Sequence, residues 1–487
     1  MNNYLDLSIV QLHQLLVNRE ITPKDLLDEA FDKIEKSELN AFITLDKEGA
    51  YRRAEELEKN KELMNESLLY GIPIAIKDNI NTKGVRTTCA SHMLENFVPI
   101  EDAFVMDKVN AAGLIMVGKA NMDEFAMGST SQTSYFGAPK NPWNVTRIAG
   151  GSSGGSASSV AGGLVPFALG SDTGGSIRQP SSYCGLVGMK PTYGRISRRG
   201  LIAFASSLDQ IGPMTRNVYE NALLLNALVG HDELDLTSSK REKEDFTRLI
   251  GKDIKDLKVA VPRYFMSDIV DSEIKEKVTE VINRLKELGV TVDYIDIEHL
   301  EHAVTLYQII AMGEASSNLA RFDGVRFGYS CENPTSVDDL YERSRAEGFG
   351  AEVKRRIMVG SYLLSGDYAK EYYSKALQIR AQMKKSFDEA FEKYDLIIGP
   401  TTTTCAYPLG EGVDDPRKTF LDDVLVIPVN MAGLPGMNVP IGFNQEHMPI
   451  GLHIIGSRFE EAKMYQFAAY IEKMLDLNLK VEEVSHE

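Results

Sequence analysis

The sequence predicts an α/β protein built on one large sheet. From Leu69 onward, short apolar runs alternate with stretches of helical character, and this alternation is typical of a sheet flanked by helices. The composition, 43% hydrophobic and 25% charged residues in a chain of 487 residues, is that of a globular protein with a large core. No Pro/Ser-rich linker divides the sequence, so we expect a single large domain.

The first 63 residues are predicted to form a helical N-terminal layer. The leucine and isoleucine spacing in residues 1–16 is that of an amphipathic helix. Thr22 followed by Pro23 is typical of an N-cap and the first residue of a helix, which continues over residues 24–38. A charged run at residues 52–63 indicates exposed helix faces. The rest of the chain, residues 64–487, is expected to form one structural unit.

Short apolar runs after this layer predict the strands of the sheet. They occupy residues 72–76, 114–118, 164–170, 186–190, 257–262, 291–297, 395–400, 424–428 and 437–443. The helices expected between them cover residues 103–113, 217–229, 271–288 and 370–394.

Composition and charge exclude several classes of function. The four cysteines are far apart without a CxxC pair, and none of the eight histidines falls in an HExxH pattern, so we expect reduced thiols and no metal site. The net charge of −17 argues against tight binding of a phosphate backbone by this chain alone. We expect no membrane span, because no long apolar window occurs, and a cytoplasmic location, because the first residues lack a secretory signal.

A glycine- and serine-rich stretch, GGSSGGSASS at residues 150–159, admits several interpretations. Its composition suits a flexible linker, but a short apolar run and a second glycine cluster, SDTGGS, follow it closely. GGSSG also matches the G-x-S-x-G nucleophile elbow, which requires a preceding strand and an HGGG-type loop. PWNVTR at residues 142–147 is a poor strand, and both the HGGG loop and the phosphate-binding G-x-x-x-x-G-K-[ST] pattern are absent. What remains is a catalytic serine that works without histidine.

Lys77 ends an apolar run, and Ser152 and Ser176 lie among glycines. A serine hydroxyl is a weak nucleophile until a base takes its proton, and lysine is such a base when burial makes it neutral near pH 7. A second serine can relay the proton, because a hydroxyl both donates and accepts. Gly174 and Gly175 allow backbone N–H groups to converge, as an oxyanion hole requires. The alternative is a solvated lysine at a strand end.

Three motifs together resemble the signature region of the amidase signature family. They are IPIAIKDNI at residues 72–80, GGSSGG at 150–155 and DTGGSIRQP at 172–180. The resemblance implies a mixed sheet flanked by helices and a Ser–cis-Ser–Lys triad that hydrolyses or transfers amides through an acyl-enzyme. Carried over motif by motif, Lys77 is the base, Ser152 the bridging serine and Ser176 the nucleophile. The implied oxyanion hole consists of Thr173, Gly174 and Gly175.

Longer segments resemble one branch of that family, the glutaminase subunits of tRNA-dependent amidotransferases. They are ANMDEFAMGSTSQTSYFGAPKNPWN, GRISRRGLIAFASSLDQIGPMTR, EVKRRIM and NMAGLPGMNVPIGF, and the similarity covers essentially the whole chain. It implies a glutaminase in a three-subunit enzyme that converts Glu-tRNA(Gln) to Gln-tRNA(Gln), and often Asp-tRNA(Asn) to Asn-tRNA(Asn). The implied partners are one subunit that binds tRNA and ATP and one small subunit. ATP and Mg²⁺ are therefore expected on a partner, with no cofactor on this chain.

The resemblance also implies which residues bind glutamine. Arg356, in the RRIM motif, would hold the α-carboxylate, and Asp423 would hold the α-amino group. These residue types suit the task, since arginine offers a carboxylate two parallel donors and aspartate pairs with an ammonium. Asp422 is the alternative to Asp423. The other residues implied for this pocket are Met127, Ser129 and Tyr307.

Two other functions are compatible with these motifs. A stand-alone amidase that acts on a small amide or a peptide amide would use the same triad. A non-catalytic scaffold of the same fold would lack a triad residue, and none is lacking here.

Overall fold

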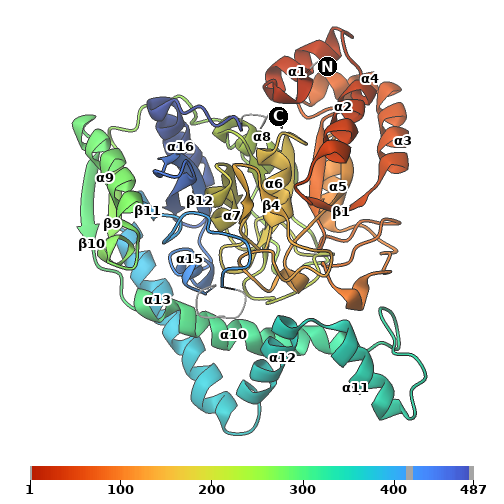
Figure 1. Cartoon of the computed structure of the whole chain (residues 1–487). Helices are drawn as coiled ribbons and strands as arrows, with labels where there is room; N and C mark the ends of the chain where they lie inside the picture. The colour runs from red at the N-terminus through yellow and green to blue at the C-terminus, as the bar shows by residue number, and fades with distance from the viewer. Residues whose placement is uncertain (1–2, 413–419, 482–487) are drawn as a thin grey trace.

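One large mixed sheet forms the centre of the protein, which confirms the fold class that the sequence predicts (Figure 1). The computed structural model describes residues 3–412 and 420–481. In spatial order, the eleven strands of the sheet are β1 (Phe42–Leu45), β3 (Ile115–Ala120), β2 (Pro73–Lys77), β6 (Phe167–Asp172), β8 (Gln210–Thr215), β7 (Val187–Lys190), β12 (Gly436–Phe443), β13 (Pro449–Gly456), β11 (Leu396–Pro400), β9 (Lys258–Pro262) and β10 (Thr291–Ile295).

The sheet combines two parallel groups with antiparallel neighbours. Strands β3, β2 and β6 run parallel, as do β11, β9 and β10. The pairings of β1 with β3 and of all the strands from β6 to β11 across the middle of the sheet are antiparallel. Several central strands are buried along their whole length, as a sheet covered on both faces requires.

Helices cover both faces and one edge of this sheet. They are α1 (Ile9–Val17), α2 (Pro23–Lys36), α3 (Lys47–Glu58), α4 (Lys61–Glu66), α5 (Phe104–Ala111), α6 (Gly154–Ala161), α7 (Arg178–Tyr183), α8 (Val218–Leu228), α9 (Ser272–Glu287), α10 (Ala303–Asn318), α11 (Val337–Gly348), α12 (Ala351–Leu363), α13 (Ser374–Phe391), α15 (Ile427–Met431) and α16 (Glu461–Leu475). In Figure 1, α1 to α4 gather at one end of the sheet, α9 lies at the other, and α10 to α13 extend below it.

The N-terminal segment begins its second helix where the sequence predicts. The side chain of Thr22 accepts a hydrogen bond from Asp25 N, the side chain of Asp25 accepts one from Thr22 N, and Pro23 is the first helical residue. The segment is not helical throughout, because β1 joins the edge of the main sheet. Ile9 N donates to Glu220 Oε1 at 2.9 Å and so connects α1 with α8.

The predicted strand at residues 424–428 is wrong. Residues 424–426 lie in a turn, and residues 427 and 428 begin α15. Val426 N and Ile427 N both donate to Asp423 O, at 3.0 and 2.9 Å, so this backbone bonds locally instead of to a neighbouring strand. Pro428, which has no N–H to offer a sheet, suits the first turn of a helix.

Strands also occur where the sequence gives little indication of them. β8, with the sequence QIGPMT, lacks an apolar run yet lies fully buried in the sheet, and β13 was likewise not expected. The judgement that residues 142–147 make a poor strand is also wrong. β5 (Asn144–Ile148) pairs with β4 (Lys140–Asn141) in a small hairpin outside the main sheet.

The glycine- and serine-rich stretch is not a linker. Most of it forms the buried helix α6, which packs against β6 and β2. A Cβ atom on Gly155 would lie 2.4 Å from Asn121 N and 2.5 Å from Ala41 O. The small side chains are therefore required because other backbone segments pass directly over this helix. Among the described residues, no helix is long and apolar enough to cross a membrane.

Candidate active site

The predicted base and the predicted nucleophile lie at or just after the carboxyl ends of two adjacent parallel strands. Lys77 is the last residue of β2, and Asp172 is the last residue of β6, which pairs in parallel with β2. Ser152 lies just before α6, and its peptide bond with Gly151 is cis. Ser176 lies in the turn between β6 and α7.

Lys77 is completely buried and contacts the predicted bridging serine. Its Nζ donates to Ser152 Oγ at 2.7 Å, to Ser153 Oγ at 2.8 Å and to Ser171 O at 3.1 Å. Burial, only partly opposed by nearby carboxylates such as Asp123, lowers the pKa of Lys77 to about 7. The alternative of a solvated lysine is therefore wrong, and near neutral pH Lys77 has both the position and the proton affinity of a base.

Ser153 is a second hydroxyl at the lysine that the sequence does not single out. Its Oγ lies 3.1 Å from Ser171 O, to which it donates, and it accepts from Lys77 Nζ. A Cβ atom on Gly170 would lie 3.0 Å from Ser153 Oγ and 2.9 Å from Ile177 Cγ1. The serine turn before α6 and the turn that carries Ser176 therefore meet over β6.

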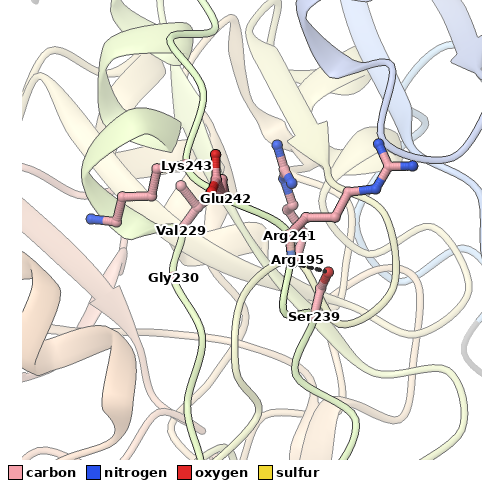
Figure 2. A pocket seen from close by; sticks show the side chains of 7 residues that line it. All are labelled: Arg195, Val229, Gly230, Ser239, Arg241, Glu242 and Lys243. Carbon is pink, nitrogen blue, oxygen red and sulfur yellow. Dashed lines mark hydrogen bonds between the residues drawn. The ribbon is translucent and has the colours of Figure 1, made fainter.

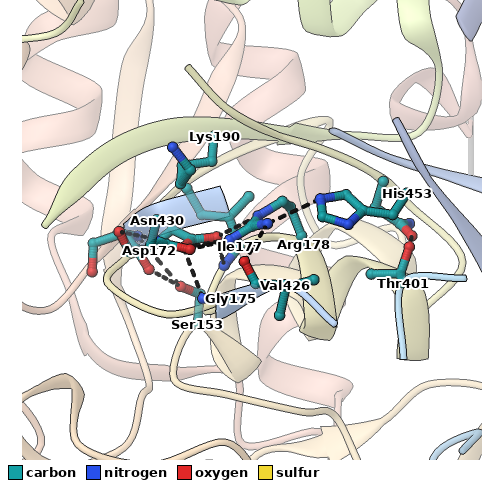
Figure 3. Close-up of polar contacts among 12 residues, drawn as sticks. Ser153, Asp172, Gly175, Ile177, Arg178, Lys190, Thr401, Val426, Asn430 and His453 are labelled. Atoms are coloured by element: carbon teal, nitrogen blue, oxygen red, sulfur yellow. Dashed lines mark hydrogen bonds and ion pairs between the residues drawn. The ribbon is translucent and has the colours of Figure 1, made fainter. Parts of the chain in front are cut away.

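The turn that carries Ser176 is built around the carboxylate of Asp172 (Figure 3). Gly175 N donates to Asp172 Oδ1 at 2.8 Å, and Ile177 N donates to Asp172 Oδ2 at 3.1 Å. Asn430 Nδ2 donates to Asp172 Oδ1 at 2.8 Å. Both backbone neighbours of Ser176 are thus held by one carboxylate, which fixes the backbone of the predicted nucleophile.

Arg178 forms a buried ion pair with the same carboxylate. Its Nε and Nη2 both donate to Asp172, at 3.1 Å each, and neither side chain is exposed to solvent. Burial alone would raise the pKa of Asp172, but the Arg178 guanidinium holds it well below its usual range. Arg178 Nη1 also donates to Val426 O at 3.0 Å and contacts His453 Nε2 at the same distance (Figure 3).

The side chain of Ser176 makes no hydrogen bond with any of the residues that the structure describes, and Ser176 is almost completely buried. The amides of Gly174 and Ser176 likewise have no acceptor in residues 3–412 and 420–481, whereas the amide of Gly175 is engaged by Asp172. Thr173 Oγ1 donates to Asp209 Oδ1 at 2.7 Å. Of the predicted oxyanion residues, Gly174 thus presents an unengaged N–H beside the nucleophile and Gly175 does not.

The predicted ammonium-binding group lies against this turn. A Cβ atom on Gly175 would lie 2.7 Å from Asp423 Oδ1. Ser129 Oγ donates to Asp423 Oδ2 at 2.5 Å, while the buried Oδ1 has no hydrogen-bond partner among the described residues. Asp422 instead accepts a hydrogen bond from Tyr407 Oη at 2.7 Å. Of the two adjacent aspartates, Asp423 is therefore the one that faces the turn of Ser176.

Burial raises the pKa of Asp423 well above its usual range, and the neighbouring carboxylates of Asp422 and Asp172 add to this effect. An ammonium placed beside Oδ1 would act in the opposite direction, because an opposite charge favours the ionised carboxylate.

Arg356 enters the same region from α12. Its guanidinium carbon lies 5.5 Å from the ring centroid of Phe204 and 5.3 Å from that of Phe420. Nε donates to Glu352 Oε1 at 2.7 Å, and the other two guanidinium nitrogens have no acceptor among the described residues. Two parallel N–H donors on a guanidinium that is 4% exposed suit a carboxylate.

Tyr307 and Met127 have different positions relative to this site. A Cβ atom on Gly174 would lie 2.8 Å from Cε2 and Cζ of Tyr307, so that ring lies against the turn of Ser176. Burial raises the pKa of Tyr307, and the charges of Arg356 and Asp423 both act on it. The side chain of Met127 is fully buried in the main hydrophobic core.

Two other hollows lie outside these residues. The pocket in Figure 2, which Arg195 and Arg241 help to line, has a cavity volume of about 10 Å³, enough for one water molecule. A wider groove of about 500 Å³ is lined by Ser206 and Ser207 from one side and by Glu314 of α10 from the other. None of the predicted site residues lines either hollow.

Sequence reasoning did not assign roles to several residues that hold this site together. They are Ser153, Asp172, Arg178, Gln179, Asp209 and Asn430. For two of them a signal exists, since Asp172 and Arg178 are opposite charges that bracket Ser176 within an otherwise uncharged buried motif. Within the described part of the chain no group of histidine, cysteine, aspartate and glutamate side chains is placed to hold a metal ion.

Comparison with known proteins agrees with this geometry. Residues 25–464 match the sequence profile of the amidase family. The chain is 51% identical over 479 residues to the A subunit of the glutamyl-tRNA(Gln) amidotransferase of Pediococcus pentosaceus, covering 98% of each chain. It is also 51% identical over 475 residues to the corresponding protein of a Geobacillus species, covering 97% of this chain and 98% of the relative.

The fold also matches a solved structure. The crystal structure of the A subunit of the glutamyl-tRNA(Gln) amidotransferase from Thermotoga maritima superposes with a TM-score of 0.80 at 39% identity, covering 96% of this chain and 95% of the other. The motifs, the fold and these similarities agree, and the chain belongs to the amidase family.

Proposed function

We propose that this chain is the glutamine-hydrolysing component of a tRNA-dependent amidotransferase that converts Glu-tRNA(Gln) to Gln-tRNA(Gln). The names of relatives that share half of its residues over almost its whole length support this assignment. The observation that carries the catalytic part is the bond from Lys77 Nζ to Ser152 Oγ at 2.7 Å, made by a lysine whose pKa burial lowers to about 7. Amide hydrolysis without histidine requires such a base.

Glutamine would bind with its two charged groups on opposite partners. The two guanidinium nitrogens of Arg356 that have no acceptor among the described residues would take the α-carboxylate, and Asp423 Oδ1, which likewise has no partner there, would take the α-ammonium. The ring of Tyr307 would lie beside the side chain, because it already contacts Gly174. This arrangement places the side-chain amide of glutamine toward Ser176.

The proposed chemistry uses the hydrogen bond between Lys77 and Ser152 to carry the proton of Ser176. Ser176 Oγ attacks the amide carbon, passes its proton to Ser152, and Ser152 passes its own proton to neutral Lys77. The N–H groups of Gly174 and Ser176 stabilise the tetrahedral oxyanion. The proton returns to the leaving nitrogen, ammonia departs, and water releases glutamate from the glutamyl ester on Ser176.

The remaining steps require partners. Activation of the tRNA-borne carboxylate needs ATP, for which this sequence has no phosphate-binding motif, so we assign ATP, Mg²⁺ and tRNA to a second protein of the complex. A small third subunit completes the proposed complex. A net charge of −17 fits this division, because affinity for nucleic acid comes largely from lysine and arginine on phosphates.

The nucleophile can be tested by trapping. We expect Ser176→Ala to abolish glutamine hydrolysis with an unchanged thermal unfolding midpoint, because only the attacking oxygen is lost. Mass spectrometry after an acid quench of the wild type should find a glutamyl ester on the peptide that contains Ser176. Ser158→Ala is the control, because the buried Ser158 hydroxyl donates to Lys140 O and takes no part in the contacts of Lys77 described above. An ester on Ser152 would disprove the assignment.

The base should be visible in the pH dependence. A protonated Lys77 cannot accept a proton, so kcat/KM for glutamine should fall as the pH drops through about 7. Lys77→Arg should lose nearly as much activity as Lys77→Ala, because a guanidinium stays protonated near neutral pH. Lys83→Arg, in the exposed loop after β2, should have no effect. An active Lys77→Arg enzyme would show that the lysine is not the base.

The carboxylate site has a matched control on the same helix. Arg355 and Arg356 both contact Glu352, but only Arg356 is buried between Phe204 and Phe420. We expect Arg356→Ala to raise KM for glutamine by about 30-fold or more, since loss of a buried charged partner costs about 2–5 kcal/mol. Arg355→Ala should change KM by less than about threefold. If both substitutions raised KM equally, the α-carboxylate would bind to a residue other than Arg356.

The division of labour predicts weak tRNA binding by this chain alone. Filter binding of Glu-tRNA(Gln) at about 150 mM salt should detect no complex at low micromolar protein, because phosphate contacts need basic surface. Glutaminase activity should rise when the partner subunits, charged tRNA and ATP are added. A stand-alone amidase would instead show full activity without partners, and tight tRNA binding by the isolated chain would contradict the proposal.

A further inference from the structure

Gln179 connects two loops of the active site through a single buried side chain. It lies on α7, three residues after Ser176, and is completely buried. Its Oε1 accepts from Gly151 N at 3.0 Å, and its Nε2 donates to Ser129 O at 2.8 Å. Both partners are backbone groups, one in the loop that carries the relay serine and the other in the loop that carries Ser129.

Each of these two loops leads directly to one function of the site. Gly151 immediately precedes Ser152, whose hydroxyl contacts Lys77. Ser129 donates its hydroxyl to Asp423, the proposed ammonium partner. Gln179 therefore bonds the residue that precedes the relay serine on one side. On the other side it bonds Ser129, whose hydroxyl in turn bonds Asp423.

The two loops and α7 are in direct contact, so few adjustments are open to them. A Cβ atom on Gly151 would lie 2.6 Å from Thr130 N and 2.8 Å from Ser129 C, and one on Gly150 would lie 2.5 Å from Gln179 Oε1. No room remains between the loops for a side chain. A shift of one loop is thus transmitted to the other through packing and through the amide of Gln179.

An amide is the side chain that this position requires. It accepts on one arm and donates on the other within a single plane, which neither a carboxylate nor a thioether can do. We propose that Gln179 is a positioning residue that couples occupation of the ammonium site at Asp423 and Ser129 to alignment of Ser152 with Lys77. This inference rests on the proposed function for its ammonium site, whereas its effect on the relay serine does not.

A structurally matched control exists in Gln210. This buried glutamine on β8 also accepts from a glycine amide, Gly194 N, at 2.9 Å and donates to a backbone carbonyl, Ile196 O, at 3.1 Å. Among the described residues, its side chain bonds only backbone groups of Gly194, Ile196 and Ile211, whereas its backbone pairs with Asp172 between β8 and β6. Gln179→Met and Gln210→Met therefore remove equivalent hydrogen bonds, and a purely structural role predicts equivalent consequences.

The experiment measures kcat and KM of the wild type and both variants, in the assembled enzyme, with two substrates. These are glutamine and glutaramate, the analogue in which hydrogen replaces the α-amino group. We expect Gln179→Met to lower kcat about tenfold or more with both substrates, because Gly151 N and Ser129 O lose their buried hydrogen-bond partner. We expect it to raise KM for glutamine but not for glutaramate, because only glutamine carries the ammonium group. Gln210→Met should lower the unfolding midpoint similarly while its kcat and KM stay within about threefold.

Gln179→Glu serves as a second variant if the methionine variant does not fold. At a pH high enough to ionise this buried glutamate, it still accepts from Gly151 N but has no proton for Ser129 O, whereas the protonated form can make both hydrogen bonds. We expect the ionised variant to retain kcat with glutaramate within about threefold and to lose most of the preference for glutamine.

The outcomes separate the two proposals. If Gln179→Met loses only stability, like Gln210→Met, the positioning role is wrong. If it lowers kcat but leaves the preference for glutamine over glutaramate unchanged, the coupling to the ammonium site is wrong. If the wild type itself shows no preference for glutamine, the proposed ammonium site fails, while kcat with glutaramate still decides whether Gln179 aligns the relay.

Discussion

The active site depends on the buried ion pair between Asp172 and Arg178. The carboxylate at the end of β6 accepts from the amides on both sides of Ser176 and from Asn430, while the guanidinium compensates its charge. Loss of either partner of such a pair leaves an uncompensated buried charge and costs about 3–5 kcal/mol. The pair therefore fixes the backbone on both sides of the nucleophile.

The same burial makes the lysine useful as a base. Among the residues that the structure describes, Lys77 has no carboxylate in hydrogen-bond contact, and its three acceptors are two hydroxyls and a carbonyl. Removal from water consequently lowers its pKa to about 7, whereas the paired Asp172 stays ionised at any ordinary pH. Burial thus lowers the pKa of Lys77, whereas the ion pair with Arg178 keeps Asp172 ionised. Recognition comes from distant parts of the sequence, with Arg356 on α12 and Asp423 on the turn before α15.

The sequence by itself determined the fold class, the first long helix with its cap at Thr22, and most of the strands, because apolar periodicity and capping chemistry are local. It also identified Lys77 and Ser152, which the structure brings into contact. Strands without an apolar run, such as β8, could not be recognised, since their burial comes from neighbours on both sides of the sheet.

Only the tertiary structure decided the features that depend on contacts between distant parts of the sequence. It showed that residues 154–161 form a buried helix, whose glycines are required because other backbone segments pass directly over it. It distinguished Asp423 from Asp422, two residues of identical chemistry, because Asp423 accepts a hydrogen bond from Ser129 and Asp422 accepts one from Tyr407. It also placed Gln179 between two loops far away in the sequence, and no local pattern encodes a contact made by backbone groups 28 and 50 residues away.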